Sequence, residues 1–108
     1  LALQVEGLEG VRNLNDILNV PGFDVLFVGP YDLSQSAGKP GDVSAPEVLA
    51  LIREIADKTR QKGIILGGFC DTSENANLLR NEGFNYLAYS VDVNIHLEAC
   101  AKVKRIIA

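Results

Sequence analysis

Two carboxylates stand where predicted strands end in the first third of the chain. Glu6 closes residues 1–6, where apolar and polar side chains alternate, and Asp32 follows the apolar run Val25–Val28. Parallel α/β folds gather their chemistry at the carboxyl ends of strands. Neighbouring strands lie about 4.8 Å apart, so two such carboxylates can converge on one cation. Hard oxygen ligands with open positions for water suit Mg²⁺ or Mn²⁺. On spacing alone, simple turn-capping roles for both acids remain an alternative.

The segment after the second strand is rich in glycine, proline, serine and aspartate. Residues 29–42 read GPYDLSQSAGKPGD, and we expect a loop from Gly29 to Ala45. A connection of this length between a strand and a helix is often functional. Its glycines allow backbone N–H groups to approach and hold an anion.

The sulfur and imidazole groups offer less chemistry. His96 is the single histidine and falls in the last predicted helix, where we expect a packed or partly exposed residue; no Cys/His set for zinc accompanies it. Cys70 ends the third predicted strand as a small buried apolar residue or, alternatively, as part of a pocket wall. Cys70 and Cys100 are predicted to be free thiols in a reducing, cytoplasmic compartment.

The elements that must position these residues alternate along the chain. The predicted strands are residues 1–6, 25–28, 64–66 with an extension into 67–70, and 84–90. The predicted helices are residues 9–18, 46–62, 72 or 73 to 79, and 93–107. Pro46 is a good first helical residue, and Gly63 and Gly83 are good helix stops.

Four strand–helix units in a row predict an α/β fold with a parallel sheet. The strand ends near residues 6, 28, 70 and 90 lie 22, 42 and 20 residues apart, a mean near 28. A (β/α)₈ barrel averages about 25–31 residues per unit, so residues 1–108 fit a single domain with half the units of such a barrel. An open doubly wound sheet is the alternative.

Composition excludes several classes of function. The 108 residues carry 14 acidic and 10 basic side chains, a net charge of −4, so no basic footprint for nucleic acid or an anionic membrane is present. No apolar run approaches the roughly 20 residues of a membrane span. A hydrophobic share of 47% is typical of a globular protein.

Three stretches of the sequence together resemble one enzyme family. They are Gln4-Val5-Glu6, then VPGFDVLFVGPYDLSQSAGKPG at residues 20–41, then APEV at residues 45–48, with weaker matches in GGFC and YSVD. They resemble the HpcH/HpaI aldolases, which are metal-dependent, pyruvate-using class II aldolases on a (β/α)₈ barrel. The resemblance covers nearly the whole chain and maps onto strands five to eight, the C-terminal half of that barrel.

The resemblance implies roles for particular residues. The family's metal ligands fall on Glu6 and Asp32, and its metal-side glutamine falls on Gln4. The substrate pocket falls on Gln4, Gly29, Pro30, Tyr31 and Asp32, with the Tyr31 and Asp32 backbone amides on the pyruvate carboxylate. A Mg²⁺ or Mn²⁺ ion would stabilise the pyruvate enolate formed when 4-hydroxy-2-oxoacids are cleaved or made.

The sequence also departs from the family pattern. The family's histidine base and its arginine on the ketoacid come from the first half of the barrel, and no residue here takes either role. Ala45 stands where a histidine is frequent, and Tyr31 is larger than the residue usual there. The resemblance therefore implies a lyase domain acting on pyruvate and an aldehyde. The alternative is a catalytically incomplete half-barrel that acts as a metal-binding or assembly module.

The predicted sheet has two edge strands, residues 1–6 and 84–90. Neither carries an internal proline or a charge before its end, and unprotected edges of this kind recruit partners. We expect the chain to form a homo-oligomer or to pair with the missing half-barrel.

Overall fold

One parallel sheet of four strands organises the chain. The computed structural model describes residues 1–108, and its strands are β1 (Ala2–Val5), β2 (Val25–Val28), β3 (Ile65–Cys70) and β4 (Tyr86–Tyr89). They lie side by side in the order β1-β2-β3-β4, and every pairing is parallel. Sequential order with right-handed crossovers carries the chain across the sheet in one direction, as in a barrel. A doubly wound sheet reverses its strand order, so the sequential order observed here does not match the doubly wound alternative.

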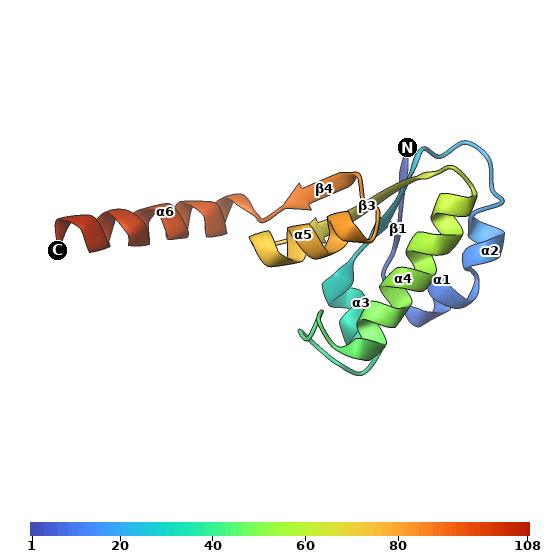
Figure 1. The fold of residues 1–108 in the computed structure, drawn as a ribbon, viewed down its shortest axis with the longest axis horizontal. Helices are drawn as coiled ribbons and strands as arrows, with labels where there is room; N and C mark the ends of the chain where they lie inside the picture. Colours follow the sequence, from blue (N-terminus) through green and yellow to red (C-terminus); the bar gives the residue numbers. More distant parts are fainter.

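The helices follow the strands (Figure 1). They are α1 (Leu8–Arg12), α2 (Leu14–Ile17), α3 (Pro30–Ser36), α4 (Pro46–Gln61), α5 (Ser73–Asn81) and α6 (Asp92–Ile107). The helix starts and stops follow local chemistry: the Thr72 side chain caps α5 by accepting from the Asn75 N–H, and Gly63 and Gly83 take φ of +69° and +92° after α4 and α5.

Two of the expected elements differ from the structure. The single helix predicted over 9–18 is wrong, because the chain forms two short helices that meet at Asn13. The segment predicted as a loop over 29–45 contains α3. Pro30 at its first position fixes a helical φ, and Leu33 is fully buried beneath it. The helices at 46–61, 73–81 and 92–107 confirm the other three predictions within one to two residues.

The core lies between the helices and one face of the sheet. Sixteen buried apolar residues form one cluster, which includes Val5, Leu26, Val28, Leu66 and Cys70 from the strands. Side chains alternate between the two faces of a strand, so residues such as Gln4, Phe27 and Tyr86 occupy the opposite face. That face is uncovered: Tyr86 is 54% exposed and Ile65 is 48% exposed.

Gly67 lets two aromatic rings meet on the uncovered face. Gln4, Phe27, Gly67 and Tyr86 share one row across the sheet, and a Cβ at Gly67 would lie 2.9 Å from Phe27 and 3.0 Å from Tyr86. In its place the two rings pack edge to face with centroids 6.3 Å apart.

Helix α6 stands apart from the rest of the chain. It extends beyond β4 as a separate rod, and the molecule measures 56 × 29 × 21 Å as a result (Figure 1). No residue of α6 is buried, and its exposed apolar side chains include Val93, Leu97, Val103, Ile106 and Ile107. The structure confirms the helix itself. Its sequence carries an apolar stripe of the kind that packs against a partner, but no other part of this chain covers that stripe. No helix is both long enough and apolar enough to cross a membrane.

Candidate functional site

Gln4 and Glu6 lie together at the carboxyl end of β1. Gln4 belongs to the face that carries Phe27, and Glu6 is the first residue after β1 ends at Val5. The Gln4 side-chain amide donates a hydrogen bond to the Glu6 carboxylate. Both side chains are exposed, and Glu6 forms no ion pair. The pairing leaves the other carboxylate oxygen of Glu6 open to a ligand.

Gly29 brings the next strand into close contact with this pair. A Cβ at Gly29 would lie 2.9 Å from Gln4 Nε2, 3.0 Å from Glu6 Cβ and 3.0 Å from Glu6 Oε2. Its φ of −91° is open to any residue, so space, not backbone conformation, requires glycine here. The Gly29 N–H also donates to the Val5 carbonyl at 3.3 Å, which joins the two strand ends.

Asp32 lies in the first turn of α3, immediately beyond Gly29. No side chain caps the N-terminus of this helix. Asp32 is exposed and takes part in no ion pair or side-chain hydrogen bond of the structure. Its carboxylate is therefore free to bind a cation.

These residues surround a hollow of about 260 Å³ at the carboxyl ends of the strands, which we call the site hollow. It is lined by Gln4, Phe27, Gly29, Pro30, Tyr31, Asp32 and Phe69. All five residues that the sequence assigns to substrate binding line it, and Glu6 contacts Gln4 at its margin. The structure thus gathers the predicted residues in one place, while their roles stay predictions.

A buried serine holds α3 in position. The Ser34 hydroxyl donates to the Tyr31 carbonyl at 2.6 Å and accepts from the Gly41 N–H at 3.1 Å. Two residues later, the Ser36 hydroxyl accepts from the Leu8 N–H at 2.9 Å, which ties α3 to the start of α1. The two serines stand in the DLSQS sequence, but nothing in that sequence shows which backbone groups they reach.

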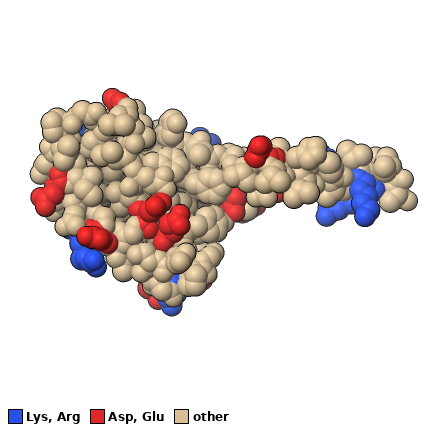
Figure 2. All heavy atoms as spheres, turned by 180° about the vertical axis from the view of Figure 1, so that it is seen from behind, with Lys and Arg blue, Asp and Glu red and all other residues tan.

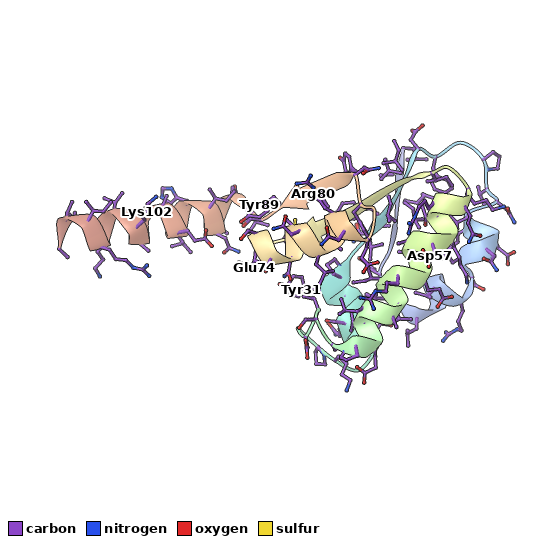
Figure 3. All side chains as sticks on the ribbon, in the orientation of Figure 1. Tyr31, Asp57, Glu74, Arg80, Tyr89 and Lys102 are labelled. Carbon is purple, nitrogen blue, oxygen red and sulfur yellow. The ribbon has the colours of Figure 1, made fainter.

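A second polar pair closes the β3 side of the hollow, and sequence reasoning missed it. The Tyr31 hydroxyl donates to Asp71 Oδ2, and the Asn75 side chain donates to Asp71 Oδ1 at 3.2 Å. The Tyr31 ring also packs edge to face on Phe69, with centroids 6.2 Å apart. Figure 3 shows Tyr31 where α3 approaches α5. Asp71 comes directly after β3, and its position at a strand end is the signal that could have found it.

The hydrogen bond between Tyr31 and Asp71 shifts both pKa values. Accepting the phenol proton lowers the pKa of Asp71 below its ordinary value, with the Asn75 amide adding to the effect. The same bond, with some burial and the negative charge of Asp71, raises the pKa of Tyr31 to about 12. At neutral pH Tyr31 is therefore a neutral phenol that donates its proton to the ionised carboxylate of Asp71.

The side chains of the site supply only part of the ligands that a divalent ion needs. Two exposed carboxylates with hard oxygen atoms suit Mg²⁺ or Mn²⁺. No cluster of three or more His, Cys, Asp or Glu side chains that could hold a metal is present. An ion on Glu6 and Asp32 would therefore take its remaining ligands from water and from oxygen atoms of a bound substrate. Figure 2 shows acidic side chains gathered near the middle of the body, with no lysine or arginine directly beside them.

The remaining sequence candidates lie away from the hollow. Cys70 is 1% exposed and packs in the core, as the apolar interpretation predicts, and burial raises its pKa. His96 lies on α6 with its Nε2 atom 3.7 Å from Cys100 Sγ, and both residues are exposed. Neither side chain lines the site hollow.

Comparison with known proteins places this arrangement in a family. The family model described as HpcH/HpaI aldolase/citrate lyase matches residues 1–99. A hydroxypyruvate/pyruvate aldolase of Chromohalobacter salexigens is 37% identical over 99 residues, which are 92% of this chain and 39% of that protein. A 2-keto-3-deoxy-L-rhamnonate aldolase of Escherichia coli is 34% identical over 92% of this chain and 37% of that protein.

Solved structures agree with the sequence comparison. An HpcH/HpaI aldolase/citrate lyase family protein from Burkholderia cenocepacia superposes with a TM-score of 0.93 at 32% identity, over 98% of this chain and 41% of that one. Macrophomate synthase superposes with a TM-score of 0.70 at 21% identity, a likeness of fold alone. The chain spans about two fifths of the length of the aldolases named above. By sequence and by structure, this chain belongs to the HpcH/HpaI aldolase/citrate lyase family.

Proposed function

We propose that the chain provides the ion-binding and 2-oxoacid-binding part of a metal-dependent carbon–carbon lyase. The reaction would cleave or form 4-hydroxy-2-oxoacids from pyruvate and an aldehyde. One observation carries the proposal: Gln4, Gly29 and Asp32 line a single hollow, and the Glu6 carboxylate adjoins it. Aldolases of the same family match 92% of the chain.

Each residue of the hollow has a task in this proposal. Glu6 and Asp32 would hold the ion, and the Gln4 amide fixes the orientation of the Glu6 carboxylate. The uncapped amides of Tyr31 and Asp32 in the first turn of α3 would donate to the carboxylate of the 2-oxoacid. When bound, Mg²⁺ or Mn²⁺ supplies a Lewis acid that stabilises negative charge developing on a 2-oxo oxygen.

Proton transfer is assigned to no residue of this chain. The site hollow holds neither histidine nor lysine, and the one histidine lies on α6. In a complete (β/α)₈ barrel the base would come from the other four units. A positioned general base contributes about 10²–10⁴-fold to rate, so we expect the chain by itself to turn over far more slowly than a complete family member.

A metal-binding or assembly module is the second candidate function, and the exposed surfaces support it. The sheet face with Phe27 and Tyr86 is uncovered, the edge strands β1 and β4 have no further partner, and α6 buries none of its residues. We propose that the chain associates with a second copy or with the complementary half of a barrel.

The free thiols of Cys70 and Cys100 fit a cytoplasmic location.

Titration calorimetry with Mn²⁺ tests the ion site. We expect saturable binding by the unmodified chain and strong weakening in Asp32→Asn. Asp16→Asn is the matched control, because Asp16 is an exposed carboxylate on α2 outside the hollow. Equal affinity in the unmodified chain and Asp32→Asn would remove the ion site from the proposal.

Exchange of the pyruvate C3 protons in deuterated water separates the two candidate functions. A lyase part with ion and substrate sites should catalyse slow exchange that depends on Mn²⁺ and is lost in Asp32→Asn. A binding or assembly module should bind Mn²⁺ without exchange above the free-ion rate.

A further inference from the structure

Tyr31 occupies the boundary between two empty spaces. One is the site hollow, and the other is a smaller neighbouring recess of about 20 Å³, which we call the rear recess. Tyr31, Pro30 and Phe69 line both spaces. Beyond them, the rear recess is lined by two polar residues, Asp71 and Asn75, and by the apolar side chains of Val43, Ile52, Leu78 and Leu79. A space of this size holds about one water molecule.

The Tyr31 ring is held in place at both ends. Its hydroxyl donates to Asp71, which the Asn75 amide fixes from the other side, and its ring edge packs on Phe69. The ring is still 36% exposed, so packing alone does not immobilise it. Because the hydroxyl donates its proton to Asp71, it is not free to donate to a ligand, and Tyr31 lines the hollow as an aromatic group.

The hollow mixes polar and aromatic side chains. Gln4 and Asp32 are polar, Tyr31, Phe69 and Phe27 are aromatic, and Gln4 is the strand neighbour of Phe27. A 2-oxoacid whose carboxylate and carbonyl oxygens bind to the polar groups therefore leaves its apolar carbon chain to contact the rings.

We propose that Tyr31 is a specificity-determining wall that limits the site to short-chain 2-oxoacids, and that Asp71 is the positioning residue that keeps this wall closed. The inference rests on the proposed 2-oxoacid site. It adds that one ring limits the chain length of the ligand, and that removing the ring would join the hollow to the mostly apolar rear recess.

A homologous series of 2-oxoacids tests the wall. Binding of pyruvate, 2-oxobutyrate and 2-oxohexanoate to the Mn²⁺-loaded chain is measured by calorimetry for the unmodified chain, Tyr31→Ala and Tyr31→Phe. We expect the unmodified chain to prefer pyruvate, and we expect Tyr31→Phe, which keeps the ring but loses the bond to Asp71, to relax that preference as Asp71→Ala does. Tyr31→Ala should reduce that preference by about tenfold or more, the discrimination that one methylene group provides in an apolar pocket.

Asp71 is tested by the same series with two substitutions. Asp71→Ala removes the acceptor and should relax the preference for short chains while pyruvate binding is retained. Asp71→Asn keeps a side-chain oxygen that accepts from the phenol and should restore the preference. A purely structural role would make both variants lose pyruvate and 2-oxohexanoate in parallel, and that result would overturn the role of Asp71.

A probe without any polar group separates failure of the wall from failure of the proposed function. Benzene is titrated into isotope-labelled chain, and amide shifts at Ile52, Leu78 and Leu79 are followed by NMR. Saturable shifts in Tyr31→Ala but not in the unmodified chain support the wall, even if no 2-oxoacid binds. Identical shifts in these two chains, or none in Tyr31→Ala, overturn it. Pyruvate binding with an unchanged length preference in Tyr31→Ala overturns the wall and leaves the proposed function standing.

Discussion

Gly29→Ala is the sharpest probe of how the site is built, because it adds one methyl group between two strand ends. The added Cβ would lie 3.0 Å from both Glu6 Cβ and Glu6 Oε2, and 2.9 Å from Gln4 Nε2. Ordinary contact begins at 3.4 Å, so Glu6 would have to move by 3.4 − 3.0, or about 0.4 Å. One of the crowded atoms is Glu6 Cβ, which cannot move away unless the backbone immediately after β1 moves with it.

Folding stability should change little in this variant. Overpacking costs about 1–3 kcal/mol, toward the lower end at an exposed edge. Loss of glycine freedom in the unfolded chain offsets about 0.4–1 kcal/mol of that cost, since φ of −91° suits alanine. We expect a net loss of about 1 kcal/mol or less in urea unfolding. Ion binding should suffer more, because the displaced carboxylate is one of only two, and a loss of about 1.4 kcal/mol is a tenfold weaker affinity.

Calorimetry with Mn²⁺ and urea unfolding on the same samples give both quantities. Gly7→Ala is the matched control, because its added Cβ would meet only Ser36 Oγ, at an ordinary 3.6 Å. Undiminished Mn²⁺ affinity in Gly29→Ala, with the fold intact, would refute the argument that close contact at Gly29 places Glu6 for the ion.

Other consequences follow from single contacts. Thr72→Ala removes the cap of α5 and should lower the free energy of unfolding by about 1 kcal/mol in a urea titration; Thr72→Ser should restore most of it. A double-mutant cycle of Tyr31→Phe with Asp71→Ala should give a favourable coupling energy at pH 7. Because the folded pKa of Asp71 is lowered, that coupling should persist above its ordinary pKa and vanish as pH falls through the lowered value; a coupling unchanged at low pH would contradict the charged bond. Light scattering at micromolar concentration should show a species heavier than 11.7 kDa, whereas a clean monomer would mean that the exposed edges and α6 need no partner.

Much of the fold could be predicted because its signals are local. Thr72, Gly63 and Gly83 mark helix ends by their own chemistry, and the apolar runs at residues 25–28 and 64–66 mark buried strands. Helix α3 was missed because its serines and flanking glycines are typical of loops. It forms because Leu33 finds a fully buried place and Ser34 bonds to backbone on both sides.

The site could be predicted only in part, for a similar reason. Strand parity and strand ends single out Gln4, Glu6 and Asp32; Gln4 and Asp32 line the same hollow, and Glu6 is hydrogen-bonded to Gln4. The pair of Tyr31 and Asp71 joins residues 40 apart in the sequence, and no periodicity links them. The isolation of α6 was equally invisible, because an apolar stripe indicates that a helix needs a cover but not which chain provides it.

A crystal structure of the chain grown with Mn²⁺ and pyruvate tests the central claim most directly. Anomalous scattering from manganese locates the ion without reference to any assumed ligand. The account predicts one strong anomalous peak bound by carboxylate oxygens of both Glu6 and Asp32, with pyruvate completing its coordination beside Gln4 and the first turn of α3. A fully occupied peak elsewhere, or pyruvate bound away from the site hollow, would contradict it.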